Sequence, residues 1–186
     1  MSSDLYGPLA FLIGKWDSVE DNGENRAPDP DRKVENTKFR QEMEFIPIGD
    51  VNNHEQKLYG LRYSTVAWEE GDDEPFHEEV GYWLWDAENQ QVMKSFIVPR
   101  GISVNAGGTT TFDSRKFKVQ AAVGSETYGV CSNKFLNEEF KTMNYEIEIG
   151  RLDENTFSYD EDTQIKIKGQ TEIFHHTEKN VMKRVL

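Results

Sequence analysis

Apolar and polar residues alternate with a period of two along most of this 186-residue chain. The alternation is cleanest in residues 142–149, where one face carries Met143, Tyr145, Ile147 and Ile149 and the other carries Thr142, Asn144, Glu146 and Glu148. Residues 38–45 and 117–123 repeat the pattern. Such alternation indicates β-strands that bury one face and expose the other, which is typical of antiparallel sheets.

Further segments of the same kind raise the number of predicted strands to about ten. They are a short strand that begins at Lys15 and the ranges 56–68, 76–86, 91–98, 102–105, 156–168, 170–175 and 181–185. Turn-forming residues separate these ranges, so successive strands are expected to pair as hairpins. A sheet of this length removes its edges by closing, which predicts an antiparallel up-and-down β-barrel that holds a cavity.

Two segments differ from this pattern. Residues 5–13 are mostly apolar, with Pro8 where a first helical turn accepts it, and they predict a short N-terminal helix. Residues 17–36 have mixed charge and two prolines, which predicts a loop at the mouth of the cavity. The sequence therefore predicts an all-β fold in a single domain, residues 1–186.

Charge and length restrict the partners and the location of the chain. Thirty-four acidic residues against 21 basic ones give a formal charge of −13, which disfavours nucleic acids and anionic membranes because Lys and Arg bind these surfaces. The first residues lack the basic and apolar segments of a signal peptide, so a cytoplasmic protein is expected. The single cysteine, Cys131, is interpreted as a buried structural residue. Whether the barrel is a monomer or a homodimer stays open.

Glu161 interrupts the apolar face of its strand. In residues 156–168 that face carries Phe157, Tyr159, Thr163, Ile165 and Ile167. A buried carboxylate needs a partner, because an unpaired charge in the interior costs several kcal/mol. Arg62 or Arg184 could supply the partner. The alternative is a β-bulge near residues 160–162 that turns Glu161 outward.

The four histidines show no spacing typical of a zinc site, and no metal site is predicted. His77 shares a strand face with Trp83, which makes it either a polar group of the cavity or a partly exposed surface residue. His175 and His176 are adjacent, so on a strand only one of them can point into the barrel. The alternative is that they begin a turn over residues 176–180.

Gly14 and Trp16 form a Gly-x-Trp motif directly after the apolar N-terminal segment. This order resembles the lipocalin-like (calycin) superfamily, in which a helical turn plugs one end of the barrel beside the tryptophan. The resemblance implies that Trp16 is a structural residue. It also implies that Arg184, on a late strand, packs on the Trp16 indole through a cation–π contact.

Three longer segments carry a closer resemblance. Residues 9–16 (LAFLIGKW), 79–85 (EVGYWLW) and 97–102 (IVPRGI) are similar to the fatty-acid-binding-protein-like barrels grouped with the nitrobindins. Nitrobindins are ten-stranded barrels that hold ferric haem through a histidine near the C-terminus, so the resemblance implies His176 or His175 as a haem ligand. Residues 17–24 replace the family's Gly-rich segment, and Lys179 lies nearest its ligand position, which identifies a divergent member.

Two hypotheses for the function remain, because the chain has neither a Ser-His-Asp order nor a glycine-rich loop that opens a helix. The first is a non-enzymatic protein that binds or carries a small hydrophobic molecule without a cofactor in a cavity lined by aromatic rings. Its predicted ligand-binding residues are Tyr63, His77, Trp83, Tyr159, Glu161 and Arg62. The second is a nitrobindin-like ferric haem protein with redox or nitrogen-oxide chemistry.

Overall fold

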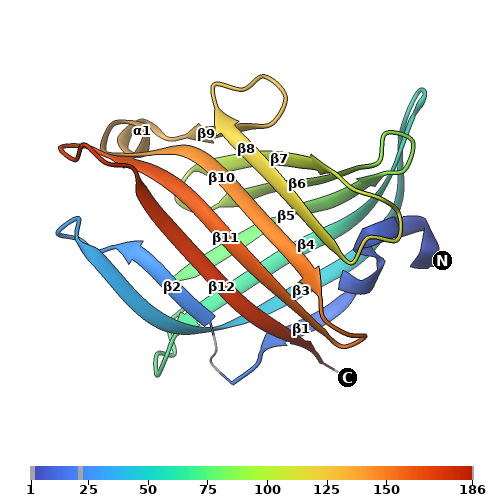
Figure 1. Cartoon of the computed structure of the whole chain (residues 1–186), viewed down its shortest axis with the longest axis horizontal. Coiled ribbons are helices and arrows are strands. Elements are labelled where there is room, and N and C mark those ends of the chain that lie inside the picture. Colours follow the sequence, from blue (N-terminus) through green and yellow to red (C-terminus); the bar gives the residue numbers. More distant parts are fainter. Residues whose placement is uncertain (1–2, 21–22, 186) are drawn as a thin grey trace.

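The computed structural model describes residues 3–20 and 23–185, which form a ring of strands with a 3-10 helix at one end (Figure 1). The 3-10 helix η1 spans Ser3–Leu12 and the α-helix α1 spans Lys134–Glu139. The strands are β1 (Gly14–Ser18), β2 (Gly23–Pro28), β3 (Val34–Asn53), β4 (Gln56–Glu69), β5 (His77–Asp86), β6 (Gln91–Val98), β7 (Ile102–Thr109), β8 (Lys116–Val123), β9 (Gly129–Ser132), β10 (Phe140–Arg151), β11 (Thr156–Ile167) and β12 (Phe174–Arg184). Neither helix in the described ranges has the length and hydropathy needed to cross a lipid bilayer.

The strands pair largely in chain order and close into a barrel. From β3 to β8 and from β10 to β12 each strand is antiparallel to the next, and β8 pairs with β10. Both β1 and β2 pair with β3 and with β12, so these two short strands share one position and close the ring. The short strand β9 is inserted between β7 and β8. The ring therefore has ten full positions, and the predicted antiparallel barrel is confirmed.

The inward faces of the strands form the core. On β10 the predicted inward face is confirmed for Tyr145, Ile147 and Ile149, which are buried. A β-bulge between Thr142 and Asn144 shifts the register, so that Thr142 is buried where the alternation predicts Met143. An extra residue in one strand moves every side chain before it to the other face, which explains this difference.

The helix η1 plugs one end of the barrel, as predicted. Its side chains Tyr6, Leu9 and Leu12 are buried against the ends of the strands. Gly7 has a φ of +52°, and a Cβ at this position would lie 2.5 Å from Nε1 of Trp85. Only glycine combines this backbone conformation with so close an approach of the indole.

Trp16 and Arg184 fasten the plug to the barrel. Trp16 is fully buried, and its Nε1 donates a hydrogen bond to the Leu12 carbonyl at 2.7 Å. The Arg184 guanidinium lies 4.2 Å from the centre of the Trp16 ring, which is the contact that the resemblance implies. Arg184 also donates hydrogen bonds to the carbonyls of Phe11 and Ile13.

Two segments that the sequence predicts as irregular are strands. Within the predicted loop 17–36, residues 23–28 form β2, while residues 21 and 22 lie outside the described ranges. Strand β12 runs without interruption through residues 176–180, so the predicted turn there is wrong. The inward positions of β12 carry His176, Glu178 and Asn180, and their polar character hides the alternation that marks the other strands.

Residues 129–139 form β9 and α1, which the alternation does not predict. The helix begins after Asn133, whose side chain accepts a hydrogen bond from the Leu136 N–H at 2.9 Å, an N-cap. Cys131 on β9 is exposed, so its interpretation as a buried residue is wrong. Strand β9 pairs by only a few residues with β7 and β8, and it does not place Cys131 in the core.

Candidate ligand-binding site

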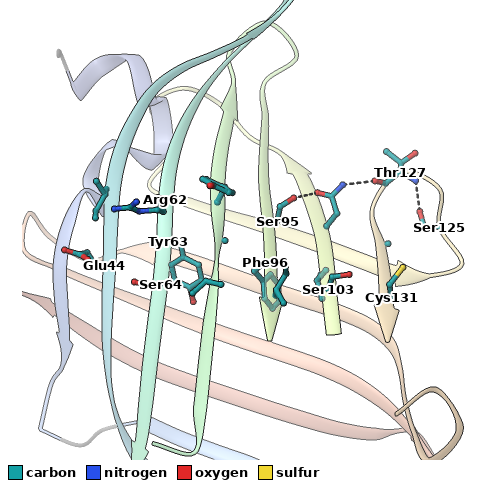
Figure 2. Close-up of a pocket in the computed structure, with 18 of the residues that line it drawn as sticks. Glu44, Arg62, Tyr63, Ser64, Ser95, Phe96, Ser103, Ser125, Thr127 and Cys131 are labelled. Atoms are coloured by element: carbon teal, nitrogen blue, oxygen red, sulfur yellow. Dashed lines mark hydrogen bonds between the residues drawn. The ribbon is translucent and has the colours of Figure 1, made fainter. Parts of the chain in front are cut away.

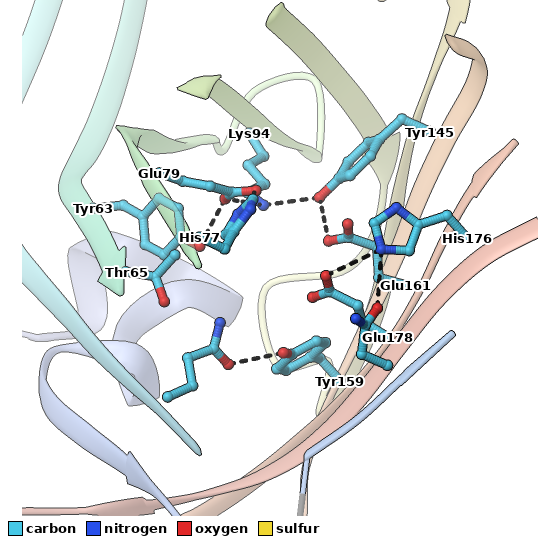
Figure 3. Close-up of polar contacts among 12 residues, drawn as sticks. Tyr63, Thr65, His77, Glu79, Lys94, Tyr145, Tyr159, Glu161, His176 and Glu178 are labelled. Atoms are coloured by element: carbon cyan, nitrogen blue, oxygen red, sulfur yellow. Dashed lines mark hydrogen bonds and ion pairs between the residues drawn. The ribbon is translucent and has the colours of Figure 1, made fainter. Parts of the chain in front are cut away.

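A group of polar side chains lies inside the barrel, at the end opposite the plug (Figure 3). Strand β5 shows this arrangement, because His77 and Glu79 stand at its start whereas Trp85, which contacts η1, stands near its end. We name the group the inner polar cluster. It comprises His77, Glu79, Lys94, Tyr145, Glu161, His176 and Glu178, surrounded by Asn25, Gln41, Tyr63, Thr65 and Tyr159.

A chain of hydrogen bonds crosses the barrel through Lys94. The Lys94 ammonium donates to Oε2 of Glu79 at 3.0 Å and to the Tyr145 hydroxyl at 2.8 Å. The Tyr145 hydroxyl donates to Oε2 of Glu161 at 2.9 Å, and the Tyr63 hydroxyl donates to Oε2 of Glu79 at 2.9 Å. The chain joins β4, β5, β6, β10 and β11, so strands far apart in sequence hold these groups in place.

Aromatic rings enclose the Lys94 ammonium, and the residue is 1% exposed. Its nitrogen lies 4.0 Å from the ring centre of Phe96, 5.2 Å from those of Tyr63 and Tyr145, and 5.9 Å from that of Trp83. A cation at such distances is attracted by the negative faces of the rings. The aliphatic part of the Lys94 side chain therefore packs with the rings in the core, while its ammonium forms hydrogen bonds within the polar cluster.

Glu79 is the best-paired carboxylate of the cluster. Burial raises its pKa, but the charges of Lys94 and His77 and their hydrogen bonds outweigh burial and lower the pKa to about 2. His77 Nε2 lies 3.4 Å from Oε1 of Glu79. Burial lowers the pKa of His77, yet the hydrogen bond and the charge of Glu79 raise it to about 9. Glu79 is thus ionised and His77 cationic at neutral pH.

Glu161 faces inward, and its charge is only partly compensated. The predicted bulge at residues 160–162 is absent, because β11 keeps its register with β10 and β12 through these described residues. Burial raises the pKa of Glu161 to about 7; the charge of Lys94 opposes this shift, and the charges of Glu178 and Glu79 add to it. Its position directly opposite Glu178 is therefore costly near neutral pH.

Glu161→Gln is expected to stabilise the protein above neutral pH. A folded-state pKa of about 7 against an ordinary value of 4.5 means that stability falls as pH rises between these values, by about 3 kcal/mol. Glutamine cannot ionise and keeps an acceptor for Tyr145. Urea unfolding should show a gain that grows from pH 4.5 to 7 and then levels off. A gain that does not vary with pH would contradict the raised pKa.

The two adjacent histidines point to opposite sides of β12. His176 faces inward, where its Nε2 lies 3.0 Å from Oδ1 of Asn25 and 3.5 Å from Oε1 of Glu178. His175 faces outward, and its Nδ1 lies 2.7 Å from Oδ2 of Asp162. Burial raises the pKa of Glu178, but the hydrogen bond and charge of His176 lower it below its ordinary value. Of these two adjacent histidines, only His176 faces the interior of the barrel.

The predicted site residues divide between the interior and the outer surface. Those with side chains in or beside the inner polar cluster are Tyr63, His77, Trp83, Tyr159 and Glu161. Arg62 instead is exposed and lines a groove of about 850 Å³ on the outer face of the sheet (Figure 2). Arg62 faces outward because its two neighbours on the strand, Leu61 and Tyr63, face inward, and successive side chains of a strand point to opposite faces. The predicted pair of Arg62 or Arg184 with Glu161 is therefore wrong, and Tyr145 contacts Glu161 instead.

Several members of the cluster were missed by reasoning from the sequence. Lys94 alternates in register with the buried Val92 and Phe96, and Glu79 stands two residues before an inward glycine on β5. Both residues break an apolar face as Glu161 does, and that signal could have found them. Tyr145 and Glu178 carry no such signal, because tyrosine fits an apolar face and the alternation of β12 is hidden.

The fold and the cluster can be compared with known proteins. The model of the THAP4-like, heme-binding beta-barrel domain matches residues 5–184. The chain belongs to this family. The crystal structure of Rv2717c from M. tuberculosis superposes with a TM-score of 0.62 at 18% identity, covering 96% of this chain and 95% of that chain. At this identity the likeness shows the fold alone, and no curated protein sequence matches the chain.

The side-chain chemistry of His176 fits a haem ligand. It is an inward imidazole whose side chain is 28% exposed, so a molecule entering from solvent can reach it. His77 fits less well, because its raised pKa keeps it protonated and a cationic imidazole does not bind iron. Within the described ranges no group of three or more His, Cys, Asp or Glu side chains could hold a free metal ion.

Proposed function

We propose that this barrel binds a small, largely hydrophobic molecule at the unplugged end of its interior, with the inner polar cluster holding the ligand's polar group. The observation that supports the proposal most strongly is a hydrogen-bonded cluster of titratable side chains within an apolar core, open to solvent at one end. The side chains of His77, His176 and Glu178 are 25%, 28% and 13% exposed. Pockets that combine apolar walls with a few convergent polar groups and shifted pKa values are typical of ligand sites.

The family supports binding as the function class, because its model is named for a ligand held in the barrel. The cluster itself adds the expectation of a polar group on the ligand. Tyr63, Tyr145 and Tyr159 present aromatic walls, and burial raises the pKa of each hydroxyl well above its ordinary value. These hydroxyls are therefore neutral hydrogen-bonding groups at physiological pH.

Two adjacent positions on β4 allow a sharp test of where a ligand binds. Thr65 faces inward beside the inner polar cluster, whereas Ser64 faces outward and lines the outer groove. With the neutral fluorescent probe N-phenyl-1-naphthylamine, Thr65→Phe is expected to weaken binding about tenfold or more, because the ring would project from the buried Thr65 position toward the proposed site. Ser64→Phe should leave affinity within about twofold. The proposal fails if Ser64→Phe alone weakens binding, since the probe would then occupy the outer surface.

A second candidate is ferric haem held by His176, which the family match favours. When bound, haem would supply an iron centre for redox or nitrogen-oxide chemistry. His176 would hold the iron in place of its contacts with Asn25 and Glu178.

The adjacent histidines provide a matched pair for testing this candidate. In a titration with haemin, His176→Ala should abolish the Soret shift, whereas the outward His175→Ala should preserve it. His175→Ala should change the free energy of unfolding by about 1 kcal/mol or less, as for an exposed residue. His176→Ala should cost more at neutral pH, because Glu178 loses the partner that lowers its pKa. An unchanged Soret band in His176→Ala, or none in the parent protein, would eliminate His176-bound haem.

A further inference from the structure

Glu161 and Glu178 face each other directly across β11 and β12. They are register partners in the antiparallel pair, and both side chains point into the barrel. Like charges at directly opposed positions destabilise a sheet. Repulsion between the two carboxylates lowers the stability of the fold, and a bound ligand of opposite charge can offset this loss.

The two carboxylates keep unused acceptor capacity. Oε2 of Glu161 accepts the Tyr145 hydrogen bond, and Oε1 of Glu178 lies 3.5 Å from His176. Among the described residues, the other oxygen of either side chain forms no hydrogen bond or ion pair, and neither oxygen is a buried atom without a partner. Lys94 and His77 both bind Glu79, and His176 contacts Oε1 of Glu178, so among the described residues no basic side chain forms an ion pair with Glu161. The Glu161–Glu178 pair therefore retains negative charge and free lone pairs, beside aromatic walls.

A separate observation also indicates a missing molecule. Trp83 is 2% exposed and stands opposite Lys94 in the pairing of β5 with β6. Its Nε1–H is buried and has no acceptor within the described part of the chain. A buried N–H group without an acceptor is rare in proteins and is usually satisfied by water or a ligand. The interior near Lys94 thus lacks a hydrogen-bond acceptor, which water or an acceptor atom elsewhere on a ligand can provide and an ammonium cannot. Within the described residues Nε1 of Trp85, beside η1, lacks an acceptor in the same way.

We infer that the ligand carries a protonated amine, which Glu161 and Glu178 bind together. This inference rests on the proposed binding function and names the chemistry of its ligand. An ammonium has three donors and no acceptor, which matches two facing carboxylates. The rings of Tyr145 and Tyr159 stand beside the pair, as at other sites for organic cations. An anionic head group would instead meet three carboxylates, and a hydroxyl would leave their charge uncompensated.

Three compounds of similar shape separate the charge of the ligand from its apolar part. They are 2-phenylethylamine, 2-phenylethanol and 3-phenylpropanoate, titrated by calorimetry at neutral pH. The amine is expected to bind about tenfold or more tightly than the alcohol, and the carboxylate is expected to bind more weakly than both. The inference is overturned if the alcohol or the carboxylate binds as tightly as the amine.

Variants then identify the carboxylates. Glu161→Gln and Glu178→Gln should each weaken amine binding about tenfold or more, without weakening the alcohol. Glu146→Gln is the matched control, because Glu146 lies on the outer face of β10 and pairs with Lys118, and it should bind the amine as the parent does. Glutamine keeps the size of the side chain and relieves the like-charge contact, so both test variants should fold.

The outcomes separate the two proposals. If N-phenyl-1-naphthylamine binds in a way that depends on Thr65 but the amine shows no preference, the amine inference falls and the binding function stands. If both glutamine variants bind the amine as tightly as the parent does, the amine inference likewise falls and the binding function stands. If neither that probe nor any of the three compounds binds, both proposals fall together.

Discussion

Replacing Lys94 with methionine is expected to lower the free energy of unfolding by about 3 to 5 kcal/mol at neutral pH. Methionine nearly preserves the volume of the side chain, so the loss of stability measures the contribution of the Lys94 charge. Glu79, which is 5% exposed, would remain buried without its closest cation, and Tyr145 would lose a donor. The loss should shrink as pH falls, because a protonated Glu79 needs no cation.

Urea unfolding of Lys94→Met beside Lys118→Met provides the measurement. Lys118 also contacts a glutamate, Glu146, at 2.9 Å, but both side chains are well exposed, so its loss should cost about 1 kcal/mol or less. The double variant Lys94→Met/Glu79→Gln should be less destabilised than the sum of the single variants, because neither charge is left alone. Equal stability of the parent and Lys94→Met would show that the chain of hydrogen bonds contributes nothing to folding.

The barrel could be predicted because most inward positions are apolar. On β10 and β11 buried residues such as Ile147, Ile149 and Phe157 recur at every second position, and a period of two is typical of a strand that buries one face. The same reasoning fails on β12, where inward residues are polar. The turn considered as an alternative for residues 176–180 was favoured by the same polar residues, among them His176 and Glu178, that belong to the inner polar cluster.

Only some residues of the site could be predicted one by one, and their assembly could not be predicted. Parity alone shows that Glu161 breaks an apolar face, and the structure places it inside. Its partners depend on which strands face each other across the barrel and on the position of each residue along the barrel axis. The alternation of inward and outward residues along one strand gives neither. Arg62 was considered as a partner for its charge, although it alternates with Leu61 and Tyr63 and must face outward.

The same limit applies to the identity of the ligand. The family match and the structure establish the β-barrel fold, yet a fold does not specify which molecule it binds. Three inward carboxylates and two inward histidines distinguish this interior from an apolar lumen. The haem and amine proposals use different members of this cluster, so His176→Ala and Glu161→Gln separate them.

Trp16→Ala is expected to lower the free energy of unfolding by about 3 to 5 kcal/mol, the range for deleting a large aromatic side chain from a core. The indole is fully buried, and its ring lies 4.8 Å from that of Phe157 in an edge-to-face contact. Its loss also removes the hydrogen bond to Leu12 and the surface on which Arg184 packs, so the plug would detach from β1 and β12.

The half-buried Trp68, whose ring packs under Arg40 on the barrel surface, is the matched control. Trp68→Ala should cost about 1 kcal/mol in urea unfolding. Because Trp16 stands at the plugged end and the inner polar cluster at the other, folded Trp16→Ala should bind N-phenyl-1-naphthylamine with an affinity within about threefold of the parent. A Trp16→Ala protein of normal stability that no longer binds the probe would move the ligand to the plugged end, away from Glu161 and His176.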